Sequence, residues 1–81
     1  MEYIATFFSH FGAVDFKKKC DRHQISSRLM PVPRTLSSSC GICVKYTAEH
    51  YLPTFGLTEE IEQIAEVQSD SFSIIYRAKD I

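Results

Sequence analysis

Two cysteines, Cys40 and Cys43, stand three residues apart at mid-chain, in a stretch of prolines, serines and glycine that spans residues 31–43. This composition predicts a loop between the apolar segments on either side, and loops held by a rigid scaffold often carry functional groups. A thiolate is both a nucleophile and a metal ligand, so the stretch suggests thiol chemistry centred on Cys40. Cys20 lies on an apolar helical stripe and is predicted to be a core residue.

A reactive Cys40 must be exposed and must ionise readily, which requires positive charge or hydrogen-bond donors nearby. The candidates for stabilising an anion there are Arg34, the hydroxyls of Ser37, Ser38 and Ser39, the Gly41 N–H, and a helix start at Ser9 and His10. The alternative is that the serines only close a long loop and that Cys40 is inert.

The sequence Cys40-Gly41-Ile42-Cys43 is also a CxxC motif, with Cys43 as a candidate resolving thiol. In thioredoxin-like proteins this motif follows the first strand and opens a helix, whereas here residues 42–47 alternate as a strand does. Residues three apart in a strand lie ~10 Å apart, beyond the ~7 Å between Cα atoms that a disulfide tolerates. A strand therefore disfavours a bridge, and a helix start at Cys40 would allow one.

Metal and nucleic-acid sites receive little support. Two thiols are half of a structural zinc site, and His10, His23 and His50 lack ligand spacing, so only a dimer could complete one. We expect no metal and no cofactor. A net charge of −1 and a pI near 6.3 give no field that would favour nucleic acid. Lys17 to Lys19 are predicted to form a solvated helix face.

Length and composition predict a single globular domain over residues 1–81, with 44% apolar and 23% charged residues. No apolar run approaches the ~20 residues of a membrane span. The first eight residues lack a basic region and predict a strand, not a signal peptide. Together with an odd cysteine count, this predicts a cytoplasmic protein without structural disulfides and without membrane attachment.

The apolar patterning predicts four strands, at residues 3–8, 25–32, 42–47 and 72–77, and two helices. The first helix spans 10–23, with Ser9 as its cap and Ala13, Phe16 and Cys20 on its buried face. The second spans about 58–68: Thr58 is its cap, and its apolar stripe comprises Ile61, Ile64, Ala65 and Gln68. Residues 48–57 contain Pro53 and Gly56, which break any long helix.

This order, βαββαβ, predicts an α+β, ferredoxin-like fold: a four-stranded antiparallel sheet with two helices on one face. Strands 3–8 and 42–47 should be central and the other two should lie at the edges. Strands 3–8 and 25–32 then run in the same direction. The start of the first helix, residues 9–12, should therefore meet the loop of residues 34–41. A helix N-terminus offers free N–H groups that suit a thiolate, a persulfide or a bound anion.

The run Arg-Leu-Met-Pro-Val-Pro-Arg-Thr-Leu-Ser-Ser-Ser-Cys-Gly over residues 28–41, within a short chain of this pattern, resembles the selenium/sulfur carrier-like family of small bacterial proteins. The resemblance covers nearly the whole chain and implies that Cys40 carries reduced sulfur or selenium, with Arg34, the three serines and Gly41 around it. Two features depart from the family pattern: Cys43, where an aliphatic or small residue is usual, and the insertion with Pro53 and Gly56.

The hypothesis is therefore a carrier protein, not an enzyme, that holds a persulfide or selenosulfide on Cys40. Its expected partners are a cysteine-desulfurase-type donor and an acceptor protein, with no nucleic acid and no membrane. The alternative is a non-catalytic interaction or regulatory module, because small ferredoxin-like domains often bind partners or form homodimers through the open sheet face. Less favoured is a CxxC thiol-disulfide protein.

Overall fold

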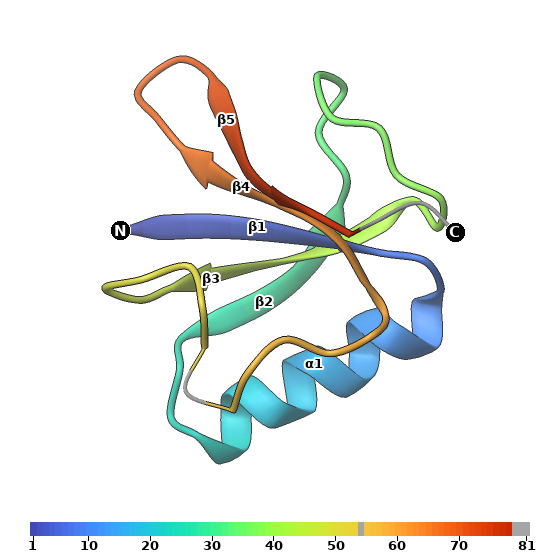
Figure 1. The fold of residues 1–81 in the computed structure, drawn as a ribbon, viewed down its shortest axis with the longest axis vertical. Helices are drawn as coiled ribbons and strands as arrows, with labels where there is room; N and C mark the ends of the chain where they lie inside the picture. Colours follow the sequence, from blue (N-terminus) through green and yellow to red (C-terminus); the bar gives the residue numbers. More distant parts are fainter. Residues whose placement is uncertain (54, 79–81) are drawn as a thin grey trace.

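The computed structural model describes residues 1–53 and 55–78 of the chain. Their regular structure consists of one helix and five strands. In chain order they are β1 (Glu2–Phe7), α1 (His10–Arg22), β2 (Ser27–Pro31), β3 (Ile42–Thr47), β4 (Ile61–Val67) and β5 (Phe72–Arg77). Figure 1 shows the helix on one side of a twisted sheet, while the β2–β3 loop and the β4–β5 hairpin rise on the other. No helix within these described ranges is long and apolar enough to cross a bilayer.

The five strands form one antiparallel sheet in the order β2-β3-β1-β4-β5. Because β3 is antiparallel to both β1 and β2, these two strands run in the same direction, and α1 connects them past β3. The C-terminal end of β1, the start of α1 and the β2–β3 loop therefore lie at one end of the sheet, as predicted. β1 is central, and every residue from Tyr3 to Phe7 is buried.

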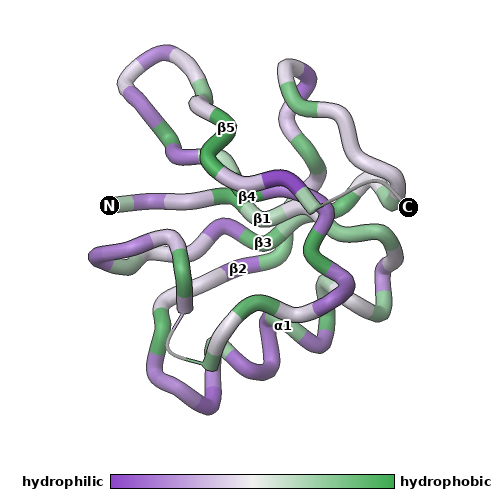
Figure 2. Tube along the Cα trace, in the orientation of Figure 1, coloured by the Kyte–Doolittle hydropathy of each residue, from purple (hydrophilic) through white to green (hydrophobic). Residues whose placement is uncertain are grey.

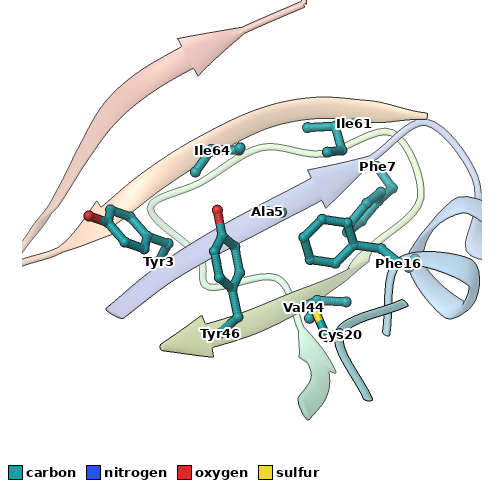
Figure 3. Close-up of a cluster of buried hydrophobic side chains, with 10 residues drawn as sticks. Tyr3, Ala5, Phe7, Phe16, Cys20, Val44, Tyr46, Ile61 and Ile64 are labelled. Carbon is teal, nitrogen blue, oxygen red and sulfur yellow. The ribbon is translucent and has the colours of Figure 1, made fainter. Parts of the chain in front are cut away.

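Helix α1 begins where the sequence predicts and buries the predicted face. The Ser9 side chain caps it by accepting a hydrogen bond from the Gly12 N–H at 3.2 Å. Phe16 packs between the sheet residues Phe7 and Tyr46, with ring centroids 5.2 and 5.4 Å away (Figure 3). Cys20 closes the far end of this core and is fully buried, so its prediction as a core residue is confirmed.

The ferredoxin-like prediction is wrong. The described residues contain five strands and one helix in place of four strands and two helices. The predicted second helix, residues 58–68, is the end of an irregular crossover followed by β4, which pairs with β1 on one side and β5 on the other. Strand 72–77 lies at an edge as predicted, but β4 separates it from β1. Strand 42–47 is confirmed over its helical alternative.

A β-bulge explains why β4 resembles a helix in sequence. Ala5 pairs with Ile64 and Phe7 pairs with Ile61, so residues two apart on β1 face residues three apart on β4. The extra residue at Glu62 puts Ile61 and Ile64 on the same face of the sheet, against the core that α1 covers (Figure 3). Spacing of three is the helical signal, and here a bulge produces it.

The crossover from β3 to β4, residues 48–60, covers part of the core without regular structure. Within its described residues, Tyr51, Phe55 and Leu57 pack against the buried cluster, and Phe55 meets Phe16 at 5.3 Å between ring centroids. Figure 2 shows the hydrophobic colours of this segment alternating with hydrophilic ones as it passes α1. This crossover takes the place that the prediction assigned to a second helix.

Candidate functional site

The β2–β3 loop meets the end of β1 and the start of α1, so the predicted proximity of residues 9–12 and 34–41 is confirmed. The His10 Nε2 lies 2.7 Å from the Cys40 carbonyl oxygen. The Ser38 hydroxyl donates to the Phe7 carbonyl at 3.5 Å. A carbonyl only accepts, so Nε2 carries the hydrogen in this arrangement and Nδ1 of a neutral ring is free to accept.

Cys40 is half-buried and packs against the core cluster on the side of the sheet that α1 covers. Its thiol donates to the Ile42 carbonyl at 3.3 Å, and its amide donates to the Ser38 hydroxyl at 3.4 Å. Gly41 follows with φ of +80°, a conformation that glycine adopts without strain. The Gly41 carbonyl accepts from the Val32 amide at 3.1 Å, which closes the base of the loop.

Glu62, at the bulge of β4, holds the loop just before Cys40. Its carboxylate accepts from the Ser39 hydroxyl at 2.8 Å and from the Ser39 amide at 3.2 Å. The Thr6 hydroxyl donates to the same carboxylate at 3.3 Å. The side-chain amide of Gln63 donates to the Ser37 carbonyl at 2.7 Å. In the described structure, therefore, the serine run is engaged in positioning the loop, and its role in binding an anion stays a prediction.

A second carboxylate occupies the helix start that the sequence suggested for an anion. The Ser9 hydroxyl donates to Glu60 Oε1 at 2.7 Å while accepting from Gly12, and the Phe8 amide donates to the Glu60 carbonyl at 3.0 Å. A side chain at Gly12 would have no room, because its Cβ would lie 2.4 Å from the Cβ of Glu60. Negative charge at a helix N-terminus is favourable, so Glu60 stabilises α1 at this position.

Sequence reasoning missed Glu60, Glu62 and Gln63 because it placed them in a helix. A signal was present in the run Glu-Glu-Ile-Glu-Gln over residues 59–63: polar side chains stay interspersed next to buried positions, which is typical of a bulged strand as well as a helix. Arg34, by contrast, lies exposed in a turn closed by the Leu36 amide and the Pro33 carbonyl at 3.0 Å. It belongs to none of the ion pairs in the described part of the chain.

Cys43 has a different environment from Cys40. It lies within β3, opposite Thr6 and Met30, on the face of the sheet away from α1, and its side chain is 0% exposed. Burial, with a smaller contribution from the charge of Cys40, raises the pKa of the Cys43 thiol to about 11. Burial likewise raises the pKa of Cys20 to about 11. All three cysteines are free thiols.

The other histidines lie away from this site. His23 stacks with Phe55 at 5.2 Å between ring centroids, and His50 Nδ1 accepts from the Leu52 amide at 3.2 Å. Over residues 1–53 and 55–78, no three or more His, Cys, Asp or Glu side chains gather as metal ligands would. The chemistry available at this end of the sheet is therefore that of one partly buried thiol, an imidazole bonded to the carbonyl of the same residue, and a set of hydrogen-bonding loop groups.

The comparison with curated proteins and the comparison with solved structures found no match. A family model described as "Putative Se/S carrier protein-like" matches residues 2–77, which is nearly the whole chain. The match takes in every strand, the helix and the whole loop before Cys40. The chain therefore belongs to the selenium/sulfur carrier-like family.

Proposed function

We propose that this protein carries reduced sulfur or selenium on Cys40, as a persulfide or selenosulfide, between a donor enzyme and an acceptor. The observation that supports this most directly is the contrast among its three thiols. Cys40 is only partly buried, whereas Cys20 and Cys43 are fully buried and have raised pKa values. A carrier needs one accessible thiol, and the family's description as Se/S carrier-like supports sulfur or selenium as the cargo.

The loading step is an exchange between two sulfur atoms. The Cys40 thiolate attacks the outer sulfur of a persulfide on the donor cysteine, a new S–S bond forms on Cys40, and the donor's S–S bond breaks. The donor leaves as a thiolate, and the proton on the outer sulfur is retained, so atoms and electrons balance. Unloading is the same exchange with the acceptor's thiolate as the attacking group.

Several groups at this end of the sheet would support a charged sulfur. His10 hydrogen-bonds to the Cys40 carbonyl through Nε2, and its Nδ1 would donate to an anionic sulfur only when the ring carries a hydrogen on both nitrogens. The Ser38 and Ser39 hydroxyls and the Gly41 amide would reach an added sulfur atom if the loop reorganised, and Arg34 would supply charge from the turn. Cys43 takes no part, because it lies buried on the other face of the sheet.

We propose a cytoplasmic location, which the three free thiols support because such thiols persist in a reducing compartment. The donor would be an enzyme of the cysteine-desulfurase type, which forms a persulfide on its own cysteine. The acceptor would be any protein or metabolite with a thiolate or similar nucleophile. Cys43 is buried on the other face of the sheet, which argues against its acting as a resolving thiol for Cys40. That role was the main argument for a thiol-disulfide protein.

The test is the intact mass of the non-reduced protein before and after incubation with inorganic polysulfide. We expect the wild type and Cys43→Ala to gain one sulfur atom and Cys40→Ser to gain none. Retained loading in Cys40→Ser would disprove the carrier role of this residue. A loss of two hydrogens in the wild type would instead mean that Cys40 and Cys43 form a disulfide. No change of either kind would favour an interaction module.

A further inference from the structure

The outer face of α1 carries apolar side chains that the fold does not use. Phe11 is 74% exposed and Val14 is 38% exposed, one turn apart at the start of the helix. The buried face of α1 is complete without them, because Ala13, Phe16 and Cys20 fill it. An exposed phenylalanine contributes nothing to the core, and aromatic side chains are prominent among the anchors of protein interfaces.

Cationic side chains continue the same face toward the end of the helix. At 3.6 residues per turn, Phe11, Lys18 and Arg22 lie within about 20° of one line, and Arg22 lies ~16 Å along the axis from Phe11. Both cations are exposed. Their neighbours are already paired: Lys17 with Asp21 at 2.7 Å and Lys19 with Asp15 at 3.2 Å. Over residues 1–53 and 55–78, no ion pair includes Lys18 or Arg22.

This stripe begins next to His10, which hydrogen-bonds to the Cys40 carbonyl. Phe11 follows His10, whose ring lies on the Cys40 carbonyl, so the apolar end of the stripe and Cys40 belong to one end of the molecule. Figure 2 shows the hydrophilic residues that follow along the outer turns of α1, away from the sheet. Phe8, just before the helix cap, is also exposed at this end of the molecule. The other exposed apolar side chains lie on other elements: Met1, Leu29, Leu52, Ile74 and Ile75.

We infer that the outer face of α1 docks the persulfide donor enzyme, which would present an apolar pocket for Phe11 and acidic side chains for Lys18 and Arg22. The inference rests on the proposed carrier function and specifies its donor by surface chemistry. Charge complementarity selects an acidic protein over a membrane or nucleic acid, because two cations suit a local acidic patch while the chain as a whole has a net charge of −1. A stripe ~16 Å long fits within one standard interface of about 800 Å² per partner.

The experiment compares two sulfur donors on the same Cys40. One is a cysteine desulfurase of the same cell supplied with L-cysteine, and the other is inorganic polysulfide, which needs no docking. The loading rate is followed by intact mass for the wild type, Phe11→Ser and the double variant Lys18→Glu/Arg22→Glu. We expect each variant to slow loading by the desulfurase about tenfold, as truncated anchors and reversed interface charges do. Loading by polysulfide should stay within about twofold of the wild-type rate, because a small donor makes no contact with α1.

Two matched substitutions serve as controls. Ile75→Ser removes an apolar side chain of 38% exposure from the edge strand β5, and Arg28→Glu reverses an exposed cation on β2. Both should load from the desulfurase at the wild-type rate. Raising the salt concentration should slow loading of the wild type toward the rate of the charge-reversed variant. Added salt shortens the distance over which exposed charges attract, which is about 8 Å at physiological ionic strength.

The outcomes separate docking from loading. Wild-type rates in the α1 variants with the desulfurase would overturn the docking inference, and so would loading by polysulfide with none by the desulfurase. Equal slowing with both donors would also overturn it, since the substitutions would then act on Cys40 itself. Failure of polysulfide to load the wild type would refute the carrier function, which is a different result.

Discussion

Cys40 and Cys43 are three residues apart in sequence but belong to two different regions of the molecule. Cys40 lies in the loop before β3 and is partly buried, with its carbonyl bonded to His10 and the preceding Ser39 held by Glu62. Cys43 lies within β3, fully buried on the opposite face of the sheet and opposite Thr6. Alternation along β3 turns Cys43 to the face opposite Val44 and Tyr46, whereas Cys40 precedes the strand and the turn at Gly41. A CxxC spacing therefore implies a redox pair only where the backbone brings both thiols to one side.

The largest expected effect is a contrast in thiol reactivity. With a pKa of about 11, only about one Cys43 thiol in ten thousand is ionised at pH 7, and burial also blocks access. In native protein treated with iodoacetamide at neutral pH, we expect Cys40 to be alkylated at least about 100-fold faster than Cys43 or Cys20. Peptide mapping at several times gives the three rates.

The control for this contrast is the unfolded chain. In concentrated guanidinium chloride the three cysteines should react at similar rates, because burial no longer separates them. Rapid alkylation of Cys43 in the native protein would contradict the separation of the two regions. It would also restore Cys43 as a candidate resolving thiol.

The region around Cys40 was predictable from sequence up to β3. The Ser9 cap, the buried stripe of α1 and the strand at residues 42–47 follow from local patterns, and local patterns suffice for local structure. The proximity of the start of α1 to the β2–β3 loop was also predictable, because β1 and β2 run in the same direction on either side of β3. That part of the predicted topology is independent of the segments after β3.

The groups that hold this region in place were not predictable, because they come from β4 and the residue just before it. The spacing of three residues between Ile61 and Ile64 is typical of a helix. Only the pairing of β4 with β1 shows that a bulge at Glu62 produces this spacing. Long-range pairing overrides local propensity in such segments. Glu60, Glu62 and Gln63 reach residues 23 to 56 positions away, and no local pattern reports contacts of that kind.

A second prediction concerns this missed carboxylate. Glu62→Gln removes the charge that accepts two hydrogen bonds from Ser39 and should destabilise the fold by about 1 kcal/mol, since the group is half-buried. The effect should concentrate in the loop before Cys40. Amide hydrogen exchange should show lost protection at Ser39, while protection in the middle of β1 stays as in the wild type.

Glu66→Gln is the matched control for this charge removal. Glu66 lies on the same strand and is also half-buried, but no hydrogen bond joins its carboxylate to the loop in the described structure. It should leave the exchange of Ser39 unchanged. Equal effects of the two variants would show that Glu62 acts only through the general charge of β4, and the loop would then need another anchor.

The smallest expected effect is an alkaline loss of stability that comes from the Cys43 region. Burial raises the pKa of Cys43 from its ordinary value of 9.0 to about 11, so between these values the unfolded chain releases a proton that the folded chain keeps. This contribution is fully present below pH 9.0 and is lost as pH rises toward about 11. At pH 10 the loss from this one group should be about 1 kcal/mol.

Urea denaturation of the wild type and Cys43→Ala from pH 7 to 10.5 isolates this contribution from that of the other groups. The variant starts less stable, because it leaves a small cavity in a buried position. The difference between the two free energies of unfolding should then narrow above pH 9.0, because only the wild type loses the Cys43 contribution. Parallel curves across this range would mean that Cys43 ionises as easily in the folded protein as in the unfolded chain. The difference between the two thiols would then rest on burial alone, and not on how readily Cys43 ionises.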